Sequence, residues 1–175
     1  MAQLSTSNEL AAAFEAAHQE FLDYVGGCPD EEWEAICPRE GWPVGVVGRH
    51  VAAGHLIANR ALRTMLTGRP VPGSPEVHNA ANEAIAREHP EPTRDEVLEL
   101  AGRNARRTVD LFRGLSEAQL RIEVPMGLAG GRLLTVQGYA ELFPVHLRNH
   151  LDSMREGAAL AREAGAGARR GQARA

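Results

Sequence analysis

Two histidines in the last third of this chain have the spacing of a metal-binding pair. His146 and His150 are four residues apart in the segment 135–156, TVQGYAELFPVHLRNHLDSMRE. On a helix, residues four apart lie one above the other on the same face, so these two imidazoles can bind one ion. The alternative interpretation is a pair of half-buried histidines that only happen to share a face.

The segment 135–156 has the pattern of an amphipathic helix. Thr135 can cap its first turn. Pro144 lies two residues before His146, and a proline inside a helix is expected to kink it or to break it locally. The apolar positions that recur at helical spacing are Tyr139, Leu142, Phe143, Leu147, Leu151 and Met154.

A second helix with a histidine on its apolar face is predicted over 43–67. Pro43 suits the first helical position, because the N–H that proline lacks has no helical partner there. His50 falls within the apolar face, whereas His55 falls on a different face and is predicted not to join the same site. The apolar positions that keep helical spacing are Val44, Val47, Val51, Ala58, Leu62 and Met65.

Two further amphipathic helices are predicted over 7–25 and 93–115. The second of them begins with a capping box, Thr93 to Glu96. Four amphipathic helices joined by polar connections predict an all-α fold, a four-helix bundle. We expect one domain over residues 1–164.

The connections between these helices are rich in proline and glycine. Residues 68–92 contain five prolines and predict a long connection with a short helix over 76–88. The stretch PMGLAGGR, residues 125–132, is interpreted as a glycine-rich loop with no strand before it. The tail 165–175, GAGARRGQARA, is small, basic and aperiodic, and is predicted to be disordered.

Metal sites in helical bundles are built from side chains that point inward from facing helices. In this arrangement His50 can converge with His146 and His150. Three neutral imidazoles leave coordination positions open, as in catalytic rather than structural metal sites. Zn, Ni and Fe(II) all accept imidazole, so the ligand type does not choose among these divalent metals. No general acid or base is identified from the residue pattern.

Composition excludes several classes of protein. The hydrophobic fraction of 43% and the charged fraction of 24% are ordinary for a globular protein. A net charge of -4 argues against a nucleic-acid partner. The chain has no lysine, which excludes a Schiff-base lysine and a P-loop lysine. With no signal peptide, no membrane-spanning apolar run and two cysteines interpreted as reduced thiols, we expect a cytoplasmic location and no membrane partner.

Two segments of the chain also resemble a known family. WEAICPREGWPVGVVGRHVAAGH and TVQGYAELFPVHLRNHLDSM are similar to motifs of the DinB/YfiT-like metalloenzyme superfamily. This superfamily is related to the N-terminal domain of mycothiol-dependent maleylpyruvate isomerase. The resemblance covers residues 8–157. It makes Trp42 the lead-in tryptophan and His50, His146 and His150 the metal ligands.

The resemblance implies an up-down-down-up bundle, often a homodimer, that holds a divalent metal on three histidines. It also implies a low-molecular-weight thiol of the mycothiol or bacillithiol kind as cofactor. The leading hypothesis is therefore a metal-dependent thiol transferase that acts on an electrophilic small-molecule substrate. The chain ends after the bundle, so maleylpyruvate isomerisation itself is not expected. Two alternatives remain: a metal-dependent hydrolase on the same three histidines, and a non-enzymatic dimeric helical bundle.

Overall fold

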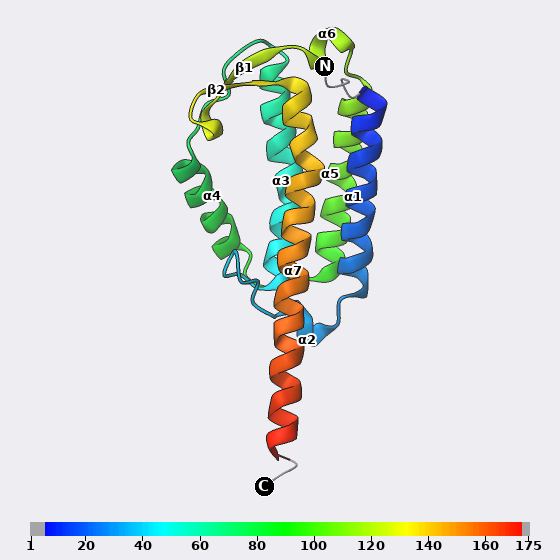
Figure 1. The fold of residues 1–175 in the computed structure, drawn as a ribbon, viewed down its shortest axis with the longest axis vertical. Helices are drawn as coiled ribbons and strands as arrows, with labels where there is room; N and C mark the ends of the chain where they lie inside the picture. The colour runs from blue at the N-terminus through cyan, green and yellow to red at the C-terminus, as the bar shows by residue number, and fades with distance from the viewer. Residues whose placement is uncertain (1–5, 173–175) are drawn as a thin grey trace.

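The computed structural model describes the backbone of residues 6–172 and the side chains of residues 6–166. Four long helices form a bundle (Figure 1). They are α1 (Ser7–Gly27), α3 (Val44–Met65), α5 (Arg94–Arg113) and α7 (Val136–Gln172). Around the bundle, α5 lies between α1 and α3, and α7 lies between α3 and α1 on the other side.

The direction of each helix gives the topology of the bundle. In Figure 1, α1 and α7 run downward from the end that holds the N-terminus, and α3 and α5 run upward. This is the up-down-down-up arrangement, so the predicted all-α four-helix bundle is confirmed. Among the described helices, none has the length and continuous apolar composition needed to cross a lipid bilayer.

Capping and buried hydrogen bonds position the helices next to one another. The predicted capping box of α5 is present, with Glu96 N–H donating to Thr93 Oγ1 and Thr93 N–H donating to a Glu96 carboxylate oxygen. Asn104 Nδ2 on α5 donates to the Ala52 carbonyl on α3 over 2.9 Å. Because each buried polar group that loses its partner costs about 1–3 kcal/mol, such a bond favours one alignment of α3 against α5.

The core lies between the four long helices and is built on aromatic and aliphatic side chains. Phe14 of α1 is its centre, with ring centroids 6.0 Å from Phe112 on α5 and 6.2 Å from Phe143 on α7. Burying a side chain of this size contributes about 1.5–3 kcal/mol. The largest fully buried residues are Phe14, Phe21, Phe112, Leu62, Met65, Leu147, Leu151, Met154, Val25, Val44, Val47 and Val51.

The connections contain more regular structure than the sequence predicts. The stretch interpreted as a glycine-rich loop without a strand forms a hairpin of two short antiparallel strands. In this hairpin, Met126 pairs with Arg132, and Gly130 and Gly131 supply positive φ angles in the turn. The shorter elements are α2 (Asp30–Trp33), α4 (Pro75–Glu88), α6 (Glu117–Leu120), β1 (Glu123–Met126), η1 (Gly127–Ala129) and β2 (Arg132–Thr135).

Helix α7 differs from its prediction at two places. It continues without a break through Pro144, where the sequence predicts a kink or a local break. It also runs beyond residue 156, and at Gly157 the helix packs closely on the loop before α3. A Cβ atom at Gly157 would lie 2.7 Å from the Ile36 carbonyl oxygen.

Helix α7 also enters the segment 165–175, for which disorder is predicted from composition. The structure continues the helix to Gln172, and residues 173–175 lie outside the described residues. The division into a domain over 1–164 and a tail stays a prediction.

Candidate metal centre

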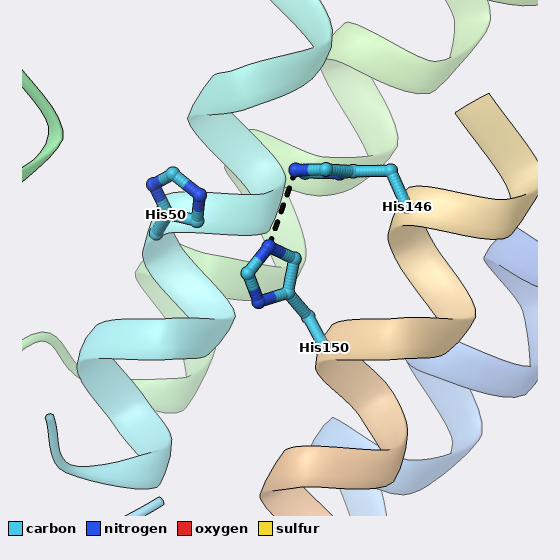
Figure 2. Close-up of side chains that lie close together, drawn as sticks. All are labelled: His50, His146 and His150. Atoms are coloured by element: carbon cyan, nitrogen blue, oxygen red, sulfur yellow. Dashed lines mark hydrogen bonds between the residues drawn. The ribbon is translucent and has the colours of Figure 1, made fainter. Parts of the chain in front are cut away.

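The structure brings the three predicted ligand histidines together from two helices. His50 comes from α3, and His146 and His150 come from successive turns of α7 (Figure 2). One ring nitrogen from each histidine lies within 4.8 Å of the others. The ring centroid of His50 lies 5.0 Å from that of His150 and 6.0 Å from that of His146.

The two histidines on α7 already have the separation that a shared ion requires. Their Nε2 atoms are 3.2 Å apart, as the dashed line in Figure 2 marks. Metal–nitrogen bonds of about 2.0–2.1 Å hold neighbouring nitrogens about 2.8–3.4 Å apart in octahedral or tetrahedral geometry. Pro144 therefore does not prevent His146 and His150 from facing one ion.

A carboxylate that the sequence did not single out orients His150. Glu40 Oε1 lies 2.7 Å from His150 Nδ1, and Ser153 Oγ donates to the other carboxylate oxygen of Glu40. When Nδ1–H donates to a carboxylate, the Nε2 lone pair remains free to bind a metal. This hydrogen bond thus selects the tautomer of His150 that can act as a ligand. Glu40 does not belong to the group of three residues that could hold an ion.

A tight turn before α3 presents Glu40 to the histidines. Gly41 has a φ of 72°, which glycine adopts without the steric cost that other residues have. Its N–H donates to the Cys37 carbonyl over 2.9 Å, and Cys37 N–H donates to the Trp42 carbonyl over 2.8 Å. In the sequence, Glu40 is marked only by its position two residues before Trp42, the lead-in tryptophan. Helical periodicity says nothing about a loop residue.

Trp42 contacts the cluster directly. Its ring lies edge-on to that of His50, with centroids 5.6 Å apart. An aromatic contact of this kind contributes about 0.5–1.5 kcal/mol beyond the apolar area that it buries. Trp42 therefore restricts the orientation of the His50 ring from the loop that precedes α3.

The surroundings of the cluster favour the neutral forms of His50 and His146. Desolvation by the protein, followed by the neighbouring His150 and His146, lowers the pKa of His50 to about 3. Desolvation and then His150 lower the pKa of His146 to about 4. Neutral imidazoles at pH 7 are the form that binds a metal.

Two other histidines lie in the core, apart from this cluster. His18 is 8% exposed and His55 is 4% exposed, and their ring centroids are 5.7 Å apart. Both rings pack against Phe14, at 5.8 Å and 5.1 Å. Within the part of the chain that the structure describes, their four ring nitrogens have no hydrogen-bond partner. His55 thus does not join the cluster, as its helical face predicts.

The same residues that form the bundle match a protein-family model. The match covers residues 13–154 and is to the DinB superfamily. The chain belongs to the DinB superfamily. The match begins within α1 and ends within α7, so this DinB-superfamily region includes all three clustered histidines.

A solved structure is similar to this DinB-superfamily chain over most of its length. It is YfiT from Bacillus subtilis, with a TM-score of 0.75, 17% sequence identity, and coverage of 94% of this chain and 92% of that one. YfiT is described as a probable metal-dependent hydrolase with an unusual four-helix bundle topology. At this identity the likeness establishes the fold. A comparison with curated proteins finds no significant match.

Removing the Glu40 carboxylate is expected to weaken metal binding by about 10–100-fold, the usual effect of losing a partner behind a ligand histidine. Glu40→Ala and Glu40→Gln both remove the negative charge that supports His150. Competition with a chelator of known affinity measures the change. Glu34→Gln, an exposed carboxylate in the same loop region, is the matched control. Equal affinities for wild type and both Glu40 variants would rule out the orienting role.

Proposed function

We propose that this chain is a metal-dependent enzyme whose divalent cation is held by His50, His146 and His150. The observation that carries the proposal is the convergence of three imidazole nitrogens, within 4.8 Å of one another, from two helices that are remote in sequence. The carboxylate behind His150 supports it, because a histidine that binds a metal is commonly oriented by a carboxylate on its other ring nitrogen. The description of YfiT as a probable metal-dependent enzyme agrees with it.

The donor set fits a catalytic cation. Three neutral nitrogen ligands suit Zn, Ni or Fe(II) and leave at least one position for an exogenous molecule. A bound divalent cation would supply positive charge that lowers the pKa of a thiol or a water placed at that position. The protein contributes orientation: Glu40 and Ser153 hold His150, and Trp42 holds His50.

The reaction that we favour is transfer of a low-molecular-weight thiol, of the mycothiol or bacillithiol kind, to an electrophilic small molecule. The thiol loses its proton to solvent, its sulfur forms a bond to the electrophilic carbon, and the leaving group departs with the bonding electron pair. We also propose that the chain forms a homodimer and is located in the cytoplasm.

A hydrolase that uses the same three histidines is the second candidate. The description of YfiT favours it, and the donor set suits water as nucleophile equally well. The two candidates differ in whether turnover requires a thiol, so one set of assays separates them.

The test is turnover by the full-length chain reconstituted with Zn, Ni or Fe(II). With a thiol and chlorodinitrobenzene, we expect chloride displacement that depends on both metal and thiol and that falls about 100-fold or more in His150→Ala. His89→Ala, an exposed loop histidine, should keep wild-type rates. Hydrolysis of a nitrophenyl ester without thiol, lost in His150→Ala, would support the hydrolase. Failure in both assays would favour the non-enzymatic bundle.

A further inference from the structure

A cleft between α1 and α5 lies at the edge of the bundle opposite the histidine cluster. Around the bundle, the pair α1 and α5 is opposite the pair α3 and α7, which carries the cluster. The volume of the cleft is about 440 Å³, within the range of about 300–1,000 Å³ that small-molecule sites have. The described residues that line it all belong to α1 or α5. The cleft is therefore separate from the candidate metal centre.

Apolar side chains and one buried histidine form the inner wall of the cleft. Phe14 and Val109 are buried, and Leu22 is half-buried. His18 lines the same cleft and is 8% exposed. Neither of its ring nitrogens has a hydrogen-bond partner among the described residues. A buried polar group without a partner is unfavourable, so a ligand that hydrogen-bonds to His18 removes this cost.

His18 can offer either a donor or an acceptor to such a ligand. Desolvation lowers the pKa of His18 to about 4, so at pH 7 its imidazole is neutral, with one N–H and one free lone pair. Its ring stacks on Phe14 and Phe21, with interplanar angles of 15° and 29°. A half-turn about the Cβ–Cγ bond keeps both stacks and exchanges the nitrogen and carbon positions of the ring. His18 can thus turn a nitrogen toward the cleft without repacking the core.

An unpaired guanidinium lies at the rim of the cleft. A Cβ atom at Gly102 would lie 3.7 Å from Arg106 Nη1, and both residues line the cleft. Among the described residues Arg106 forms no ion pair, whereas Arg113 pairs with Glu15 over 2.9 Å. The planar guanidinium of Arg106 is therefore free to bind a carboxylate through two parallel hydrogen bonds. Asp110 also lines the rim, which favours a ligand with one negative charge over a polyanion such as a nucleotide.

We propose that this cleft is a second binding site of the chain, for a small aromatic monocarboxylate that carries a hydroxyl group. The ring lies against Phe14 and Val109, the hydroxyl hydrogen-bonds to His18, and the carboxylate pairs with Arg106. A charged carboxylate is far more costly to bury than a hydroxyl, so the carboxylate takes the exposed rim and the hydroxyl takes the buried imidazole. The site does not depend on a metal ion.

Calorimetric titration of the full-length, zinc-loaded chain with 4-hydroxybenzoate tests the site. We expect saturable binding of about one molecule per chain, with benzoate and phenol each binding about tenfold more weakly, because each lacks one of the two polar groups. His150→Ala should bind 4-hydroxybenzoate with wild-type affinity. Absence of binding to the wild type would overturn the proposal. Loss of binding in His150→Ala would also overturn it, because the carboxylate would then be bound at the metal centre.

Filling the cleft tests the location of the ligand. Gly102→Leu should reduce the affinity for 4-hydroxybenzoate about tenfold or more, and leucine is a better helix former than glycine, so the variant should fold. Gly54→Leu is the matched control, because Gly54 lies inside α3, outside the cleft, and a Cβ atom there meets nothing within 4 Å. Wild-type affinity in Gly102→Leu would overturn the location. Dissociation of a homodimer in that variant would also overturn it, because a second copy of the chain would then cover the cleft.

Replacing the two polar residues tests the contact that each of them makes. His18→Leu should bind 4-hydroxybenzoate and benzoate equally, because only the hydroxyl contact is lost. Arg106→Gln should weaken both acids about tenfold and leave phenol unchanged. Arg107→Gln, at a neighbouring exposed arginine that does not line the cleft, should have no effect. A preference for 4-hydroxybenzoate that survives in His18→Leu, or wild-type affinity for both acids in Arg106→Gln, would overturn the corresponding contact.

Discussion

Replacing His50 with alanine is expected to reduce the metal content from about one ion per chain to less than about a tenth of that value. His50 is the only one of the three clustered histidines that comes from α3. Without it, the remaining two histidines come from successive turns of a single helix. A two-histidine pair on one helix is a much weaker ligand set than three converging imidazoles. Elemental analysis of protein purified without a histidine tag measures the effect.

The matched control for His50→Ala is His89→Ala. His89 is exposed at the end of α4 and lies outside the group of three, so its variant should keep the full metal content. His50 is half-buried at the edge of the bundle and not in the core, so the variant should retain the helical circular dichroism of the wild type. Full metal content in His50→Ala would contradict the three-histidine site.

The free energy of unfolding is expected to decrease as the pH falls from about 6.5 to about 4, with His18 and His55 as a main cause. Desolvation lowers the pKa of His18 to about 4, and desolvation, followed by the neighbouring His18 and His146, lowers that of His55 to about 3. In the unfolded chain both take up a proton near the ordinary value of 6.5. The unfolded state then binds more protons than the folded state, which favours unfolding by about 1.4 kcal/mol per pH unit for each histidine.

His55→Leu isolates this contribution, because leucine is apolar and of similar volume. Urea denaturation at pH 7, 6, 5 and 4 should show a flatter pH dependence for the variant than for the wild type. Stability at pH 7 should not decrease, since the substitution removes two buried nitrogens that lack protein partners. His89→Leu, at an exposed position, should keep the wild-type pH dependence. The same pH dependence in His55→Leu would contradict the prediction.

The features of this protein that depend on the local spacing of apolar residues could be predicted from its sequence. The apolar pattern around His50 and around His146 and His150 placed all three on helix faces that point toward other helices. The helical period also separated His55 from His50, and the structure places His55 in the core. Four such patterns were enough to predict the all-α bundle, because each amphipathic helix has to bury its apolar face against the others.

Only the tertiary structure decided which loops and short elements meet these helices. Glu40 and His150 are 110 residues apart, and no periodic pattern relates a turn residue to a distant helix. The strand at 123–126 is too short for a clear alternation, and its pairing with 132–135 stabilises it. The close packing of Gly157 on the Ile36 carbonyl likewise depends on two distant segments. Periodicity encodes which face of a helix is buried, whereas the partner on that face is chosen by packing between segments far apart in the chain.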